Sequence, residues 1–285
     1  MAADFVAGDL AGLSPSAVSL RESWDVLPAT VIAEIEARTG SIQSVRPAQV
    51  GYSSHVASTV HTARGRFFVK GLRTTHPAVQ TQGCEAAVNP HSVPLGPKLL
   101  WRIETDGWDV LGFEHLTGRS ADYGTESRDL SLVVGVLTEL GAIEGGGAPV
   151  SRAEQRWAQY LDPTRARLLH GDNLLHTDWN PTNVLVPQAG SVRLVDWAVA
   201  TRGAGWIDPA CWVVWLVYSG HSPDSAERWA ARVPAWRSAA AEALDFFAGV
   251  LADHWQCIAV NHPNRMTYEL RDASARWAAY RRPGD

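Results

Sequence analysis

Lysine is almost absent from this chain of 285 residues: only Lys70 and Lys98 occur, and every other basic side chain except histidine is arginine. No basic run is longer than two residues, and the formal net charge is −5. These features argue against a nucleic-acid partner, because nucleic-acid-binding surfaces concentrate Lys and Arg. A lysine that persists against this bias towards arginine is a candidate for a specific role.

Cysteines are also few, and long apolar runs are absent. Cys84, Cys211 and Cys257 are widely spaced and odd in number, so they form neither a zinc pattern nor a disulfide framework. We expect them to be thiols in a reducing cytoplasm. The most apolar stretch, ACWVVWLVY, is shorter than the roughly 20 residues that span a bilayer, and the N-terminus lacks a basic signal-peptide region. We therefore expect a cytoplasmic protein with no membrane partner.

The first part of the chain carries mostly strand signals. Apolar spacing predicts helices over 27–40 and 77–91, alternating patterns predict strands within 44–72, and Asp106-Gly107 predicts the turn of a hairpin over 98–116. This order is typical of a small antiparallel sheet with two helices. We assign residues 1–115 to this N-terminal lobe.

After about residue 117 the patterns are mainly helical. We predict helices over 127–144 and over 151–170, the second broken at Pro163, and further helices after Asp208-Pro209, which we interpret as an N-cap and first-turn pair. Residues 116–285 are expected to form a larger helical lobe. The sequence thus predicts an α+β, bilobal chain, and its 46% hydrophobic content is ample for the cores of both lobes.

The stretch LLHGDNLLHTDWNPTNVLV contains the pattern His-x-Asp twice, ending at Asp172 and at Asp178. Five residues after Asp178 comes Asn183, and a predicted strand pair brings Asp196 back towards Asn183. Five residues after Asp172 comes only a threonine, a poor metal ligand. We predict that Asp178 is the catalytic base and that Asp172 hydrogen-bonds the loop backbone.

Phosphoryl transfer requires oxygen ligands for Mg²⁺, a carboxylate that orients the attacking hydroxyl, and a cation near the inner phosphates. The residues Lys70, Glu85, Asp178, Asn183 and Asp196 supply these groups in order along the chain. The alternative is that Asp178 and Asn183 are ordinary turn residues, since DWNPTN is rich in turn formers.

These motifs resemble those of aminoglycoside phosphotransferase-type small-molecule kinases, which have a protein-kinase-like fold. The resemblance runs from about residue 45 to about 220 and is strongest at HTDWNPTNVLV and RLVDWAVATRGAGWIDPACW. It implies that Asp178 positions the acceptor hydroxyl and that Asn183 and Asp196 bind Mg²⁺. It also implies that Lys70 contacts the α- and β-phosphates of ATP and pairs with Glu85.

The resemblance further implies a hinge at residues 113–116, where backbone groups of Glu114 and Leu116 would contact the adenine. The glycine-rich phosphate loop is reduced to GYSSHV. There Ser53 and Ser54 are candidate phosphate contacts, and a plain hairpin turn is the alternative.

Other departures separate the chain from protein kinases. Asp-Phe-Gly is replaced by Asp196-Trp197-Ala198, the catalytic loop has Thr177 where protein kinases often have arginine, and no Ala-Pro-Glu follows. A kinase switched by phosphorylation of an activation loop is therefore disfavoured. The resemblance also implies that His176 packs and hydrogen-bonds the backbone, and that Asp208 braces the catalytic loop.

The predicted function is ATP- and Mg²⁺-dependent phosphorylation of a hydroxyl on a small molecule, with GTP not excluded as donor. Residues 199–285 hold nine acidic and nine basic side chains, which gives no acidic excess for a polycationic aminoglycoside. The sequence therefore does not decide the identity of the acceptor, which is an aminoglycoside, another antibiotic or a hydroxylated metabolite. We expect a monomer or weak homodimer. The alternatives are a non-catalytic, kinase-like nucleotide-binding module and, less favoured, a protein kinase.

Overall fold

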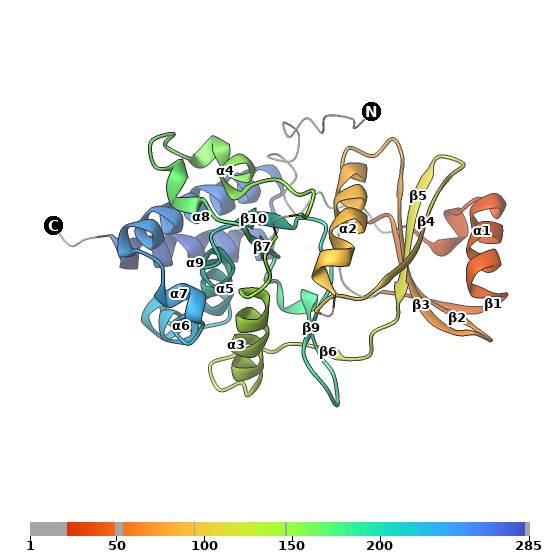
Figure 1. The fold of residues 1–285 in the computed structure, drawn as a ribbon, viewed down its shortest axis with the longest axis horizontal. Helices are drawn as coiled ribbons and strands as arrows, with labels where there is room; N and C mark the ends of the chain where they lie inside the picture. The colour runs from red at the N-terminus through yellow and green to blue at the C-terminus, as the bar shows by residue number, and fades with distance from the viewer. Residues whose placement is uncertain (1–21, 49–53, 94, 146, 283–285) are drawn as a thin grey trace.

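The computed structural model describes residues 22–48, 54–93, 95–145 and 147–282. The N-terminal lobe is built on a five-stranded antiparallel sheet of order β1-β2-β3-β5-β4. Helices α1 (Ala29–Thr39) and α2 (Val79–Ser92) lie on opposite faces of this sheet, with α2 on the side of the helical lobe (Figure 1). The strands are β1 (Ile42–Pro47), β2 (Val56–Thr62), β3 (Gly65–Arg73), β4 (Leu99–Thr105) and β5 (Trp108–Glu114).

The alternation of side chains along β3 shows which residues face each side of the sheet. Val69 is fully buried in the apolar cluster beneath α1, which also contains Val31 and Ile35. Because successive strand residues point to opposite faces, Lys70 points to the other face, towards α2. The predicted turn at Asp106-Gly107 is present, with φ of 49° and 75°, the left-handed values that suit a tight hairpin.

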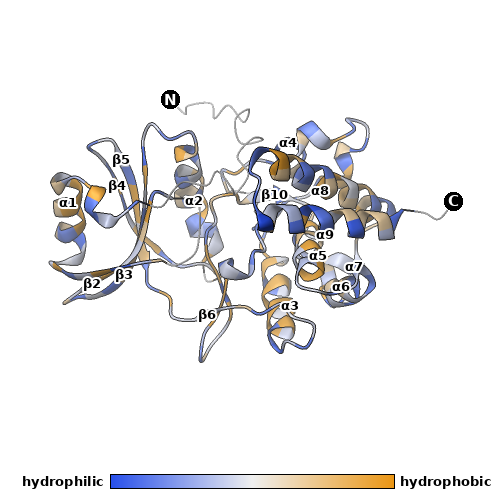
Figure 2. Ribbon diagram, turned by 180° about the vertical axis from the view of Figure 1, so that it is seen from behind, coloured by the Kyte–Doolittle hydropathy of each residue, from blue (hydrophilic) through white to orange (hydrophobic). Residues whose placement is uncertain are grey.

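The C-terminal lobe surrounds a buried helix, α5 (Ile207–Tyr218), whose residues are buried from Ile207 to Val217. This helix contains the ACWVVWLVY stretch and is coloured as mostly hydrophobic in Figure 2. No helix in the described ranges is both long and apolar enough to cross a membrane. The other helices are α3 (Asp129–Leu140), α6 (Pro223–Ala230), α7 (Pro234–Arg237), α8 (Ala241–Asn261) and α9 (Arg265–Arg281).

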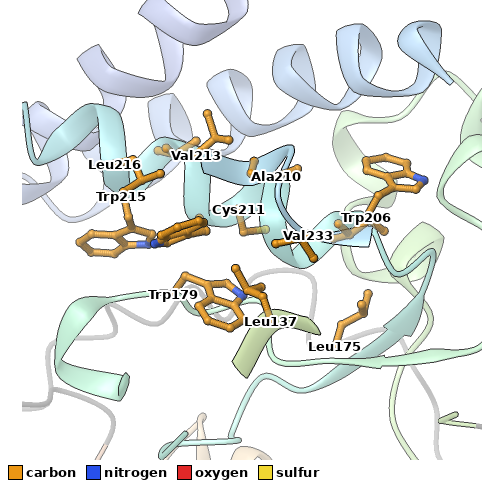
Figure 3. Close-up of a cluster of buried hydrophobic side chains, with 14 of the residues drawn as sticks. Leu137, Leu175, Trp179, Trp206, Ala210, Cys211, Val213, Trp215, Leu216 and Val233 are labelled. Carbon is orange, nitrogen blue, oxygen red and sulfur yellow. The ribbon is translucent and has the colours of Figure 1, made fainter. Parts of the chain in front are cut away.

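Short strands flank the predicted site residues Asp178, Asn183 and Asp196 along the chain. β7 (Asn173–Leu175) pairs with β10 (Thr201–Gly203), and β8 (Val184–Val186) pairs with β6 (Arg119–Ser120) and β9 (Arg193–Leu194). The segment after β7 is anchored by Trp179, which is fully buried. Figure 3 shows its indole beside Leu137 and facing α5 at Cys211. The loop that contains Asp178 is therefore held by core packing.

Two local predictions were wrong, the first of them only in part. The helix expected over 151–170 is interrupted at Pro163 as predicted, but its pieces are short: α4 (Ala153–Arg156), η3 (Ala158–Tyr160) and η4 (Ala166–Leu169). An Asp162 turn, in which its carboxylate accepts a hydrogen bond from the Thr164 N–H at 2.9 Å, interrupts the helical pattern.

The second concerns Asp208, which was expected to cap a helix. The N-cap of α5 is Trp206, and Asp208 lies one residue inside the helix. Its carboxylate instead receives hydrogen bonds from the loop around Asp178. Because those donors lie on a segment about 30 residues away in sequence, no local capping rule could have revealed this pairing.

Candidate active site

A cavity of about 250 Å³ lies between the lobes and is lined by residues from both. It brings together seven of the predicted site residues: Ser54, Lys70, Glu85, Glu114, Leu116, Asn183 and Asp196. Asp178 adjoins it through a hydrogen bond to Asn183. Ser53 lies outside the described residues.

Lys70 lies at the centre of a buried ion-pair cluster. Its Nζ contacts the Glu85 carboxylate on α2 and lies 3.0 Å from Asp196 Oδ1. Burial alone would lower the pKa of Lys70, but the Asp196 and Glu85 carboxylates outweigh it and raise that pKa. The ammonium is therefore fixed in its charged form, as a contact for phosphate requires. Glu85 also accepts a hydrogen bond from the Trp197 N–H at 3.3 Å, which links α2 to the segment after Asp196.

Asp178 and Asn183 are joined directly. Asn183 Nδ2 donates to Asp178 Oδ2 at 2.9 Å and to the Asp178 backbone carbonyl at 3.3 Å. The short helix η5 (Pro181–Asn183), capped by Asn180, produces this close approach. With Nδ2 directed at Asp178, the amide oxygen of Asn183 is left to act as a cation ligand.

The backbone at two positions of the site is strained. Thr177 and Asp196 have φ of 65° and 62°, although neither is glycine. Such conformations cost on the order of 1–3 kcal/mol each and persist only where surrounding contacts enforce them. Asp196 itself lines the cavity, and Thr177 directly precedes Asp178.

Asp208 and His176 hold the loop that contains Asp178 in place. The Asp208 carboxylate accepts hydrogen bonds from the N–H groups of His176 (3.0 Å) and Thr177 (2.7 Å) and from Trp179 Nε1 (2.8 Å). His176 is buried and bonds the Val195 carbonyl through Nε2 at 2.9 Å. Burial lowers the pKa of His176 to about 4, so the ring is neutral at pH 7. These contacts agree with the support roles expected for both residues.

Burial, together with the nearby Asp196 carboxylate, raises the pKa of Asp178 to about 6 from its ordinary value of 3.8. A raised carboxyl pKa means that the folded state disfavours the ionised form. The protonated Asp178 carboxyl therefore makes its full contribution to the free energy of unfolding below about pH 4. This contribution is lost as the pH rises through about 6. We therefore expect Asp178→Asn, without Mg²⁺ or nucleotide, to melt a few degrees higher than the wild type at pH 8, with a clearly smaller advantage at pH 4.5.

Thermal denaturation at the two pH values measures this difference. Asp172→Asn is the matched control, because Asp172 belongs to the other His-x-Asp and its side chain is 67% exposed. An Asp178→Asn advantage that is the same at pH 4.5 and pH 8 would contradict the assignment of a raised pKa to this carboxyl.

The hinge segment lines the cavity at Phe113, Glu114, His115 and Leu116. The Glu114 N–H already donates to the Lys98 carbonyl at 3.0 Å and is therefore occupied in the free protein. The Glu114 side chain is held by Arg193 at 3.0 Å. The sequence had offered no reason to pair these two residues.

The oxygen donors fit Mg²⁺ only when a nucleotide is bound as well. Among the described residues there is no group of three or more His, Cys, Asp or Glu side chains that could hold a metal ion. Asn183 and Asp196 supply two oxygen-bearing side chains at the cavity wall. Mg²⁺ prefers six oxygen ligands and commonly takes one or two carboxylates together with phosphate oxygens and water. The pair therefore suits a magnesium–nucleotide complex rather than a free metal ion.

Asp172 is separate from the cavity lining. Its exposed carboxylate lies 3.5 Å from Arg152 Nη1 and 3.7 Å from Arg202 Nε. The expected hydrogen bond to the loop backbone is thus replaced by these arginine contacts, which the sequence did not reveal because both partners come from distant segments. The sequence also failed to identify Arg156, whose contacts are described below.

Comparison with known proteins identifies the fold of this chain. No family model and no curated protein matches the sequence. The structure, however, resembles aminoglycoside phosphotransferase APH(4)-Ia with a TM-score of 0.63 and 13% identity, covering 89% of this chain and 98% of that one. It also resembles choline kinase LicA from Streptococcus pneumoniae, with a TM-score of 0.59 and 13% identity over 88% and 98% of the two chains.

A putative aminoglycoside phosphotransferase from Ralstonia eutropha JMP134 gives a TM-score of 0.60 at 13% identity, covering 88% of this chain and 97% of that one. Structures of the APH(4)-Ia protein include complexes with hygromycin B and ADP or AMP-PNP, and LicA has been determined with AMP. Identity this low establishes the fold alone. The chain has the bilobal, protein-kinase-like fold that the sequence predicted.

Proposed function

We propose that this protein is an ATP- and Mg²⁺-dependent phosphotransferase that acts on a hydroxyl group of a small molecule. The observation that carries the proposal is the convergence of Lys70, Asp196, Asn183 and Asp178 at one cavity between the lobes. The solved phosphotransferases that share the fold bind nucleotides, and one binds hygromycin B. Both facts support the same class of reaction.

In this proposal the Asp178 carboxylate accepts the proton of the acceptor hydroxyl, and the hydroxyl oxygen attacks the γ-phosphorus of ATP. The bond from that phosphorus to the β–γ bridging oxygen breaks, and ADP leaves. Lys70 binds the inner phosphates, while Asn183 and Asp196 would hold Mg²⁺, which neutralises phosphate charge when bound. Positioning and electrostatics suffice for this chemistry, so the protein needs no covalent intermediate.

We assign nucleotide binding to residues 1–115, with Ser53 and Ser54 near the phosphates and Glu114 and Leu116 at the adenine. Residues 116–285 then carry the catalytic loop and the acceptor site. The acceptor is an aminoglycoside, another antibiotic or a hydroxylated metabolite. We further propose that the protein acts in the cytoplasm as a monomer or weak homodimer.

A screen with γ-labelled ATP tests the proposal. Purified protein with Mg²⁺ would be incubated with aminoglycosides, including hygromycin B, and with choline, nucleosides, sugars and amino alcohols. We expect label in at least one compound, and none when Asp178→Asn replaces the wild type. Nucleotide binding in a thermal-shift titration without any transfer would favour the non-catalytic module. Label found only in protein would favour a protein kinase.

A further inference from the structure

Arg156, the last residue of α4, interacts with the carboxylates of Asp178 and Asp208 only from beyond ion-pair distance. No carboxylate lies within ion-pair distance of it in the ranges that the structure describes, although 18 such pairs occur elsewhere. Its Nε atom is shielded from solvent and has no hydrogen-bond partner there. Burial lowers the pKa of Arg156. Because a half-buried guanidinium with an unsatisfied Nε is costly unless its other contacts compensate, the hydrogen bonds that Arg156 does make deserve a functional explanation.

The hydrogen bonds of Arg156 go to the segment that follows Asp196. Its Nη1 donates to the Val199 carbonyl at 2.6 Å and lies 3.5 Å from the Thr201 hydroxyl. The Val199 carbonyl also accepts from the Thr177 hydroxyl at 3.1 Å and from the Thr201 hydroxyl at 3.0 Å. Of these three donors the arginine is the nearest and the only charged one, and charge-assisted hydrogen bonds are the stronger kind.

This carbonyl connects the two strained parts of the site. Thr177 (φ 65°) precedes Asp178, and Asp196 (φ 62°) lies three residues before Val199. Asp208 fixes the Thr177 backbone from one side, and the Val199 carbonyl fixes its hydroxyl from the other. The point at which the catalytic loop meets the segment after Asp196 is thus the point that Arg156 contacts.

The fold holds α4 firmly against this segment. The Arg202 N–H donates to the Ser151 carbonyl at 2.9 Å, which ties β10 to the residues before α4. A Cβ atom at Gly203 would lie 2.7 Å from the Ala153 side chain, so the close approach of α4 to β10 requires a glycine there. Arg156 follows Ala153 by one helical turn, which directs it at Val199.

We propose that Arg156 is a positioning residue that clamps the Val199 carbonyl and so fixes Asp196 and Asp178 relative to each other. The proposal rests on the function given above for its catalytic consequence, but the clamp itself is a property of the free protein. In this chain the catalytic loop has Thr177 where protein kinases often have arginine. Arg156 supplies a guanidinium beside that loop from a separate helix, α4. The clamp needs no phosphorylation to form.

Hydrogen–deuterium exchange of the free protein tests the clamp without any assumption about activity. We expect Arg156→Met to speed exchange of the amides in residues 197–203 by about tenfold or more, because a hydrogen bond to a charged group is lost. Exchange in α8 and α9 should be unchanged, and Arg156→Lys should restore part of the protection. Arg276→Met is the matched control, because Arg276 donates to the Val217 carbonyl at 3.2 Å in the same lobe.

Unchanged exchange of residues 197–203 in a folded Arg156→Met protein overturns the clamp. If Arg156→Met is too unstable to purify, the same comparison is made with Arg156→Gln, which removes the charge but keeps a polar side chain, and unchanged exchange in that variant also overturns the clamp. Steady-state ATP turnover with Mg²⁺ then tests the consequence: kcat should fall about tenfold or more in Arg156→Met while the KM for ATP stays within about twofold. A wild type without turnover refutes the proposed function and leaves the exchange result to decide on the clamp.

Discussion

Asp178→Asn is expected to lower the rate of phosphoryl transfer by about 10²–10⁴-fold, the usual contribution of a general base. Asparagine has nearly the shape of aspartate, and its amide oxygen can still accept the hydrogen bond from Asn183 Nδ2, now at 2.9 Å. It cannot accept the proton of the acceptor hydroxyl. The affinity for Mg–AMP-PNP should change little, because the proposed nucleotide contacts lie on Lys70, Asn183 and Asp196. Label transfer from ATP and a thermal-shift titration measure the two quantities separately.

Asp172→Asn is the matched control for this experiment. It makes the same chemical change in the same type of motif, at a carboxylate that is 67% exposed and outside the cavity lining. Its transfer rate should stay within about twofold of the wild type, as for a surface substitution. Full turnover in Asp178→Asn would refute the assignment of the base. Loss of activity in Asp172→Asn alone would transfer that role to the first His-x-Asp.

Asp196→Ala should abolish the part of nucleotide affinity that depends on Mg²⁺. The carboxylate is one of two oxygen-bearing side chains proposed for the ion, and it is also a partner of Lys70 at 3.0 Å. Removing it leaves Asn183 as the remaining protein ligand, too few for a stable magnesium site. We expect the affinity for AMP-PNP in the presence of Mg²⁺ to fall at least about tenfold, or about 1.4 kcal/mol.

Calorimetric titration with AMP-PNP, in Mg²⁺ and in a chelator, isolates the metal-dependent component. The wild type should bind more tightly with Mg²⁺, and Asp196→Ala should show nearly equal affinity in both conditions. Asn183→Ala, which keeps the Lys70–Asp196 contact, should lose the same component without the added effect on Lys70. Magnesium-dependent affinity that survives in both variants would refute the proposed metal ligands.

The larger features of the fold could be predicted because local signals and the final structure agree. The Asp106-Gly107 turn has the left-handed backbone that its residues favour, and the alternation in β3 separates Val69 from Lys70. Where local preference and packing disagreed, prediction failed. The helix expected over 151–170 is interrupted at Pro163 as predicted, beside a turn at Asp162, but the helical pieces on either side are shorter than the apolar spacing suggested.

The sequence by itself supplied the candidates for the proposed phosphoryl transfer, since the spacing of Asp178, Asn183 and Asp196 and the nearly unique Lys70 restrict the choice. It also determined the two-lobed α+β order, through periodic patterns that need only near neighbours. The resemblance had already pointed to Asp208 as a brace of the loop, but only the tertiary structure decided which of its atoms hold the loop and revealed Arg193 at the hinge and Arg156 on the Val199 carbonyl. Each of these contacts joins segments about 30 or more residues apart, and such contacts leave no periodic trace in the sequence because they form only when separate elements meet in the folded chain.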